Sequence, residues 1–120
     1  MPKRSEAFIK GKKVAIDVAV RPNETAPALE YFEGLSANDQ ARFISWFGIM
    51  ADTAQIGNKQ KFHSLEDGIY EFRVGKHRIL CFWVRGAGKL ILTHGFYKKT
   101  NKTPPGELKL AKAIRNEYLA

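Results

Sequence analysis

Three short apolar segments, separated by glycine turns, dominate the second half of the chain. Ile69–Val74, His77–Arg85 and Lys89–Tyr97 are rich in β-branched and aromatic residues, and Gly75-Lys76 and Gly86-Ala87-Gly88 interrupt them. Apolar runs bounded by glycine-containing turns are typical of consecutive antiparallel strands. We therefore expect a three-stranded meander around which the rest of the chain folds.

Positive charge is concentrated in the same part of the chain. The 120 residues carry a formal net charge of +8, and the segment 59–102 contains ten Lys/Arg against three Asp/Glu, which gives +7. Residues 1–58 contain seven of each kind and are balanced. Charge that served only solubility would be spread evenly, so this asymmetry favours a polyanionic partner.

The length and composition predict one α+β domain over residues 1–120. Cys81 is the only cysteine, which fits a reducing compartment, and its apolar strand predicts an inert buried thiol. The N-terminus lacks the apolar core of a signal peptide, and no apolar run approaches the roughly 20 residues of a membrane span. We expect a cytoplasmic protein without membrane contact.

The basic N-terminal segment 1–25 contains one predicted strand, Val14–Val20, which is rich in β-branched residues. Asp17 lies in the middle of this strand, and a carboxylate there predicts an edge strand or a half-solvated face. Pro22 ends the strand because proline cannot extend a ladder of hydrogen bonds.

Two consecutive helices are expected next. Asn23 or Thr25 is a candidate cap for the first helix, which Gly34 ends. Ser36 is the predicted cap of the second, and Gly57 is its predicted C-terminal stop. The apolar positions of the second helix recur at close to helical spacing, at Phe43, Ile44, Phe47, Ile49, Met50 and Ala54.

A basic loop over 57–64 and a C-terminal helix within 104–120 complete the prediction. The expected order is β-α-α-β-β-β-α, with a twisted, mainly antiparallel sheet packed by the helical hairpin. Trp46 lies near the apolar stripe of the second helix, which favours a sheet-covering role over base stacking.

A cluster of basic and polar side chains on the predicted meander is the best candidate for chemistry. A tight turn pairs the first two strands and brings Arg73 close to Arg78. Strand alternation places Arg73 on the face of Glu71, and places His94 with Leu90, opposite Tyr97. Each residue also has a structural alternative: an ion pair between Arg73 and Glu71, a hydrogen-bonded His94, and solvated side chains at His77, Lys98 and Lys99.

RNA is the substrate that suits this cluster. Attack of a 2′-hydroxyl on the adjacent phosphate needs a base for the 2′ proton, cations for the charge on phosphorus and an acid for the 5′-oxygen. Arginine supplies the cationic part through paired contacts to phosphate. The sequence has no P-loop, GxGxxG, CxxC or HExxH motif, so we expect no cofactor and no metal.

The segment LEDGIYEFR at 65–73, HRI at 77–79, LTHGFYKKT at 92–100 and KTP at 102–104 together resemble the RelE/HigB superfamily of toxins, in its phage-derived, HigB-like branch. The resemblance is close over 57–115 and loose over the first 25 residues. It implies a RelE-like fold, a metal-independent endoribonuclease that cuts mRNA on the ribosome, and a helix-turn-helix antitoxin as partner.

The resemblance also implies roles for particular residues. Arg73 and Arg78 match the family's phosphate-binding arginines, and His94 and Tyr97 lie where relatives place catalytic histidine or tyrosine. The expected RNA-binding residues are Lys59, Lys61, His77, Lys98, Lys99 and Lys102. His77 replaces an aromatic residue of the family, and the N-terminal extension is longer than expected.

Two further interpretations remain open at the level of sequence. One is a catalytically inactive RNA- or ribosome-binding module of phage origin. The other is an interaction domain whose basic face meets only an acidic antitoxin. The presence of both Arg73 and Arg78 favours the enzyme over the first alternative, but the basic face alone does not separate RNA binding from antitoxin binding.

Overall fold

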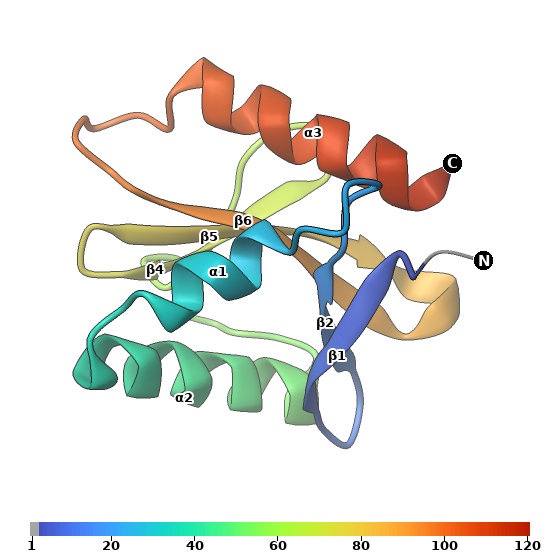
Figure 1. The fold of residues 1–120 in the computed structure, drawn as a ribbon. Helices are drawn as coiled ribbons and strands as arrows, with labels where there is room; N and C mark the ends of the chain where they lie inside the picture. The colour runs from blue at the N-terminus through green and yellow to red at the C-terminus, as the bar shows by residue number, and fades with distance from the viewer. Residues whose placement is uncertain (1–2) are drawn as a thin grey trace.

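The expected meander forms part of a six-stranded sheet in the computed structural model, which describes residues 3–120 (Figure 1). The architecture is α+β, with a twisted open sheet that is compatible with a RelE-like fold. The elements are β1 Ser5–Lys10, β2 Ala15–Ala19, α1 Pro27–Glu33, α2 Ala37–Thr53, β3 Phe62–Ser64, β4 Ile69–Val74, β5 His77–Val84, β6 Lys89–Tyr97 and α3 Pro105–Leu119.

The strands are ordered β1-β2-β6-β5-β4-β3 across the sheet. All neighbouring pairs are antiparallel except β2 and β6, which run parallel. The meander β4–β5–β6 therefore agrees with the sequence prediction. The second strand ends one residue earlier than expected, because Arg85 begins a short 3₁₀ turn that leads to Gly88.

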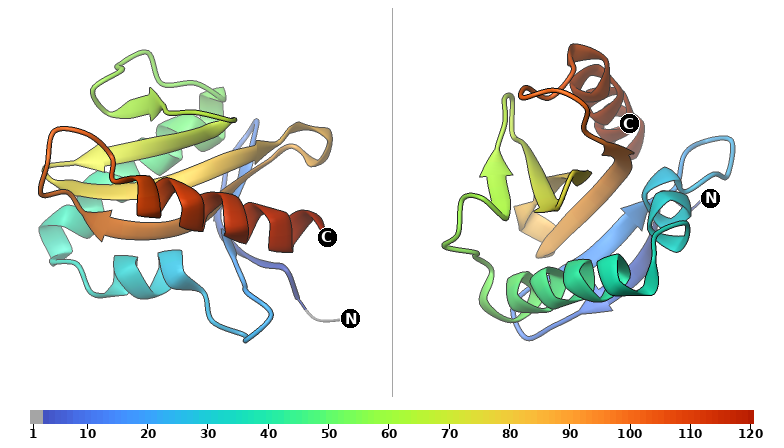
Figure 2. Two further views of the ribbon diagram at one scale, coloured as in Figure 1. Left: turned by 90° about the horizontal axis from the view of Figure 1, so that it is seen from above. Right: turned by 90° about the vertical axis from the view of Figure 1, so that its left-hand side faces the viewer.

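Helices cover both faces of the sheet, as the two views in Figure 2 show. Helices α1 and α2 pack on one face, which we call the α2 face, through a core that includes Phe47, Phe72 and Ile79. Helix α3 packs on the opposite face, the α3 face, through Leu80, Phe82 and their neighbours. Trp46 packs partly buried against the first of these cores, which confirms its sheet-covering role.

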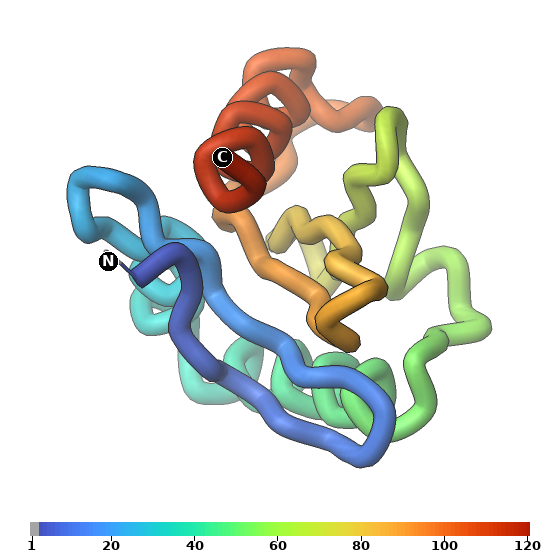
Figure 3. Tube along the Cα trace, turned by 90° about the vertical axis from the view of Figure 1, so that its right-hand side faces the viewer, coloured from blue at the N-terminus to red at the C-terminus, as the bar shows by residue number. Residues whose placement is uncertain are grey.

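The N-terminal segment forms a hairpin of two strands, of which the sequence predicted only one. Strand β1 is the edge strand, so the prediction of an edge or half-solvated β2 was wrong. Asp17 is only 4% exposed. It is tolerated inside the sheet because the Ser5 hydroxyl and the Lys89 ammonium donate to its carboxylate. Figure 3 shows the tip of the hairpin meeting the end of α2, where Ala51 accepts two backbone hydrogen bonds.

The helix boundaries differ from the prediction at two ends. Ser36 caps α2 as expected, accepting from the backbone N–H of Asp39. Helix α1, however, begins at Pro27 without a side-chain cap, because Asn23 instead accepts two hydrogen bonds from Thr25 and closes a local turn. Helix α2 ends at Thr53, where Ala54 takes the left-handed capping conformation that the sequence analysis expected of Gly57.

A bulge in β6 overturns the predicted orientation of His94. Leu80 pairs with His94 while the next residue, Cys81, pairs with Leu92, so Thr93 is an extra residue in β6. The insertion shifts the alternation by one position. His94 therefore lies on the α3 face with Phe96, whereas Leu92 belongs to the α2-face core.

The predicted basic loop over 57–64 contains strand β3, which pairs with β4 at the second edge of the sheet. Among residues 3–120, none of the helices combines the length and apolar character that crossing a membrane requires.

Candidate functional site

Arg78 is the central side chain of the candidate site. Gly75, with a φ of +58°, makes the tight turn that sets Arg78 opposite Arg73 in the β4–β5 pair. The guanidinium is 9% exposed and donates from one terminal nitrogen to the carbonyls of Gly75 and His77. Within residues 3–120 its Nε finds no hydrogen-bond acceptor. A buried donor without a partner is costly, so an anion such as phosphate that reorients the guanidinium and accepts from it would be favoured.

Glu71 balances the two arginines from the interior of the sheet. Its side chain is fully buried and accepts from Arg73 Nε at 2.7 Å and from the Thr103 hydroxyl at 3.2 Å. Its carboxylate lies 3.8 Å from Arg78 Nε, too far for a hydrogen bond. The ion pair that the sequence left as an alternative for Arg73 is thus present, while Arg78 retains an unused donor.

Two basic cavities flank these arginines on the α3 face. The first has a volume of about 240 Å³, and the second has a volume of about 280 Å³. Lys98 and Asn101 line both of them. The first is lined by Lys76, Arg78, Lys98, Lys99, Thr100 and Asn101. The second is lined by His63, Leu65, Glu66, Arg73, Lys98, Asn101, Lys102, Thr103 and Leu108.

The cationic groups of these cavities repel one another in the absence of a ligand. Burial lowers the pKa of the Arg78 guanidinium, Glu71 opposes this and Arg73 adds to it. Burial likewise lowers the pKa of Lys98, and the nearby Arg78 contributes further. An anion placed between these side chains would relieve the repulsion, so the cavities are electrostatically suited to phosphate.

His63 lines the second cavity, although the sequence analysis treated it only as part of a basic loop. It lies in β3 directly opposite Glu71, and cross-strand partners project to the same face. The signal was weak because β3 has only three residues. His63 is the one imidazole, among the described residues, that lines a cavity together with Arg73 and Lys98.

A comparison with protein families identifies the chain. Residues 30–116 match the family described as phage derived protein Gp49-like (DUF891). The chain belongs to this family. The Gp49-like family comprises RelE/toxin-like proteins. No curated protein matches the sequence. The family match includes β3 to β6 with both cavities, and it leaves out the β1–β2 hairpin.

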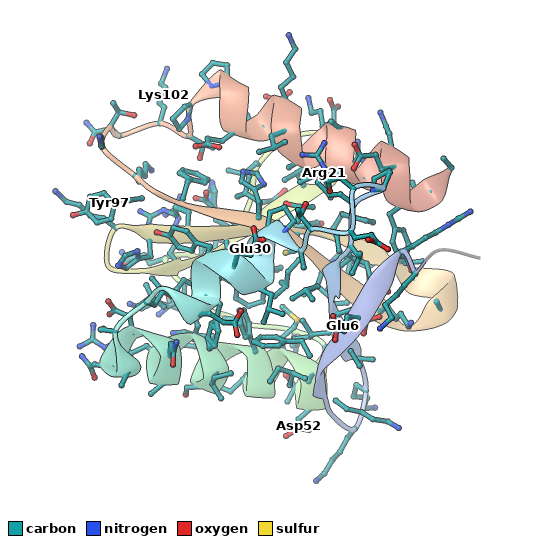
Figure 4. The ribbon with its side chains drawn as sticks, viewed as in Figure 1. Glu6, Arg21, Glu30, Asp52, Tyr97 and Lys102 are labelled. Carbon is teal, nitrogen blue, oxygen red and sulfur yellow. The ribbon has the colours of Figure 1, made fainter. Side chains whose placement is uncertain are left out.

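Five of the predicted site residues of this Gp49-like chain line the cavities: Arg73, Arg78, Lys98, Lys99 and Lys102. Figure 4 shows Lys102 in the connection from β6 to α3. Lys59 and Lys61 precede β3 and line neither cavity. Their expected RNA contact stays a prediction.

His94 is separated from the cavities by its own partners. The side chain is 4% exposed, with Nε2 at 3.1 Å from Glu107 and Nδ1 at 3.2 Å from the Thr93 hydroxyl. Burial lowers the pKa of the imidazole, against the opposing effect of Glu107. Both ring nitrogens are occupied, which is the arrangement of a hydrogen-bonded structural histidine.

His77 and Tyr97 lie together on the α2 face, opposite the side chain of Arg78. The Tyr31 hydroxyl lies 2.6 Å from His77 Nδ1, and Asp39 Oδ2 lies 3.3 Å from Nε2. The Tyr31 hydroxyl is hydrogen-bonded to the ring, and the Asp39 carboxylate lies within ion-pair distance of its other nitrogen. Burial raises the pKa of Tyr31, with further contributions from Asp39 and Tyr97. The sequence analysis missed Tyr31 and Asp39, which lie in α1 and α2.

The Cys81 thiol and a metal site are the two remaining candidates for chemistry. Cys81 is fully buried, and burial raises the pKa of its thiol well above the usual value, so it is an inert core residue. Within residues 3–120, the His, Cys, Asp and Glu side chains form no group of three or more that could hold a metal ion.

Proposed function

We propose that this Gp49-like protein is the toxin of a toxin–antitoxin pair and that it cleaves mRNA as a metal-independent endoribonuclease. The observation that carries the proposal is Arg78, which is largely buried, has no acceptor for its Nε and lines the first cavity together with three lysines. A largely buried guanidinium that its own fold leaves partly unsatisfied, at a cavity lined by further cations, is suited to bind phosphate.

The proposed reaction is attack of the 2′-oxygen on the adjacent phosphorus. The 2′-hydroxyl gives its proton to a base as its oxygen bonds to phosphorus, the bond from phosphorus to the 5′-oxygen breaks, and the 5′-oxygen takes a proton from an acid as it leaves. Negative charge grows on the non-bridging oxygens as the bonds exchange. Arg78 and Lys98 stabilise that charge, and Arg73, already oriented by Glu71, adds a second guanidinium. Loss of one such donor typically lowers the rate by about 100-fold or more.

We assign one of the two proton transfers to His63, because it lines the cavity of Arg73 and Lys98. The catalytic roles expected for His94 and Tyr97 stay predictions. His94 is held by Glu107, and Tyr97 projects from the opposite face of the sheet, so neither reaches the cavities in this conformation.

The proposed setting is the translating ribosome in the cytoplasm, with a small helix-turn-helix antitoxin as the cognate partner. The excess of +7 over residues 59–102 supports a polyanionic partner such as mRNA or ribosomal RNA. An acidic antitoxin segment would meet the same surface, which explains how a partner could block the substrate.

Induced expression followed by primer extension on a reporter mRNA tests the proposal. Wild type should arrest growth and produce new cuts inside translated codons. The double variant Arg73→Ala/Arg78→Ala should produce neither. A matched control is Lys10→Ala/Lys13→Ala, which removes the same charge from exposed positions in the N-terminal hairpin and should cut like wild type.

Two outcomes would contradict the proposal. Cuts that persist in the arginine variant would place the active site elsewhere. A folded wild type, verified by circular dichroism, that causes no arrest and no cuts would favour an RNA- or antitoxin-binding module instead.

A further inference from the structure

Tyr97 is an exposed aromatic residue at the end of β6, next in the chain to Lys98, which lines both basic cavities. It is 51% exposed, and the other exposed large apolar residues in the described chain, Ile44, Ile49 and Leu119, are aliphatic. Figure 4 shows it at the outer margin of the sheet, at the same end of the molecule as Lys102. An exposed aromatic ring next to basic residues in the chain is a feature of single-stranded nucleic acid binding.

The ring of Tyr97 packs against His77, which in turn contacts Tyr31 and Asp39. It meets the His77 ring edge to face, with 5.3 Å between ring centres and 72° between planes. His77 is itself held by a hydrogen bond with the Tyr31 hydroxyl at 2.6 Å, and the Asp39 carboxylate lies 3.3 Å from its other ring nitrogen. A ring held in place loses little conformational freedom on binding, which favours its use as a contact surface.

The close packing of Tyr31 depends on Gly95. A Cβ at position 95 would lie 2.3 Å from Cδ2 of Tyr31, closer than atoms approach. The absence of a side chain in the middle of β6 therefore lets Tyr31 lie against the strand and reach His77. The network is built from α1, α2, β5 and β6, and it is specified by residues far apart in the sequence.

The chain connects this network directly to the phosphate site. Arg78 follows His77 in β5, Lys98 follows Tyr97 at the end of β6, and the two strands pair there. The Lys98 amide also donates to the Lys76 carbonyl at 2.7 Å. A strand of RNA with its phosphate against Arg78 and Lys98 on the α3 face reaches Tyr97 when it continues around this end of the sheet.

We infer that Tyr97, supported by His77, Tyr31 and Asp39, is a stacking platform for the nucleobase next to the phosphate held by Arg78. The inference rests on the proposed function and adds a second subsite to it. The platform takes any base, because every base has an aromatic face, and it binds single-stranded RNA in preference to a paired helix whose bases are already stacked.

Fluorescence anisotropy with a six-nucleotide RNA tests the platform. The probe carries 2′-O-methyl groups throughout, so that it binds without being cleaved. Tyr97→Leu should weaken binding by about ten-fold or more, the usual effect of removing one stacking contact. Tyr97→Phe keeps the ring and should bind like wild type. Leu119→Ala removes a similarly exposed apolar side chain far from the cavities and should also bind like wild type.

A second probe with the same backbone but no bases separates stacking from a loss of charge or shape. Wild type and Tyr97→Leu should bind this abasic probe equally. A defect of Tyr97→Leu that is as large with the abasic probe as with the full RNA would overturn the inference, and so would unchanged binding of the full RNA by Tyr97→Leu.

Arg78→Ala distinguishes failure of the platform from failure of the proposed function. Both probes should lose affinity for this variant, because their phosphates lose a cation. If Arg78→Ala weakens binding and Tyr97→Leu does not, the phosphate site stands and the platform is wrong. If wild type binds neither probe, both ideas are wrong.

Discussion

Two buried carboxylates in the sheet are alike in burial and in the hydrogen bonds they accept, but they face different numbers of cations. Asp17 in β2 and Glu71 in β4 are 4% and 0% exposed, and each accepts from a hydroxyl and from a cation. Lys89 pairs with Asp17 and is otherwise free to reach water, with 36% of its side chain exposed. Glu71 faces two arginines, of which Arg78 is almost fully buried and still lacks a partner for Nε.

The two clusters differ in whether every charged group has a partner in the absence of a ligand. The Asp17 cluster is a closed structural pair at the far end of the meander. The Glu71 cluster has one more cation than its carboxylate can satisfy, and that cation faces cavities. Incomplete neutralisation inside the fold is thus a better guide to a binding site than the presence of buried charge itself.

The largest expected effect concerns the kind of cation. Arg78→Lys keeps the charge but loses the planar group that anchors to the Gly75 and His77 carbonyls and can contact phosphate through paired hydrogen bonds. We expect cleavage of RNA to fall by about 100-fold. Lys89→Arg, at the other carboxylate, should leave cleavage unchanged. Single-turnover rates with a labelled RNA measure both. Full activity of Arg78→Lys would show that only net charge matters.

The second prediction concerns stability. Glu71→Gln leaves two facing guanidiniums without a counter-charge, one of them buried, and should reduce the free energy of unfolding by about 3 kcal/mol. Asp17→Asn should cost only about 1 kcal/mol, because Lys89 can turn to solvent. Urea unfolding of both variants measures the difference. Equal losses would contradict the distinction between a closed and an open cluster.

The hydroxyl donors allow a finer comparison. Thr103→Val and Ser5→Ala each remove one hydrogen bond to a buried carboxylate, and each should cost about 1 kcal/mol of stability. Only Thr103→Val should also slow RNA cleavage, because Thr103 lines the cavity and holds Glu71 in place. Parallel melting curves and cleavage rates test this. A cleavage defect in Ser5→Ala would argue that both clusters serve the site.

The smallest effect is a pH dependence at His94. Burial lowers the pKa of the folded imidazole despite Glu107, and the charge of Arg21 acts in the same direction. The unfolded chain takes up a proton near pH 6.5, about the usual value, while the folded protein does so only at lower pH. The contribution of His94 to the free energy of unfolding is therefore complete above the pKa of the unfolded chain, and it is lost as the pH falls towards the pKa of the folded protein.

Urea unfolding between pH 7.5 and 5.5 measures the slope at His94. The variant His94→Gln cannot titrate, so its stability should change less over this range than that of wild type. A steeper change in the variant would mean that the imidazole is charged in the folded protein.

The meander and the arginines were predictable from the sequence because they depend on local signals. Glycine turns separate β4, β5 and β6, and a tight turn fixes Arg73 opposite Arg78 whatever the rest of the chain does. Edge strands lacked such signals. In β1 exposed and half-buried positions do not alternate regularly, and β3 has only three residues.

The errors and omissions have non-local causes. Asp17 was expected near solvent because nothing near it in the sequence indicated which cation pairs with it, and its partner Lys89 is 72 residues away. His94 was placed on the wrong face because one extra residue, Thr93, inverts the alternation of β6. Tyr31 lies 46 residues from His77, so nothing local indicated that the two meet. The neighbours of the site depend on the completed fold more than the site's arginines do.

The parallel pairing of β2 with β6 has a consequence for how the molecule is made. The edge of β2 that pairs with β6 stays without hydrogen-bond partners until residues 89–92 have been synthesised. Strands β4, β5 and β6, by contrast, can pair as soon as the turn between them has been made. Contacts that close such long loops form late. The hairpin at the N-terminus, although synthesised first, can therefore join the sheet only once β6 has been made, and until then its unpaired edge is open to pairing with other chains.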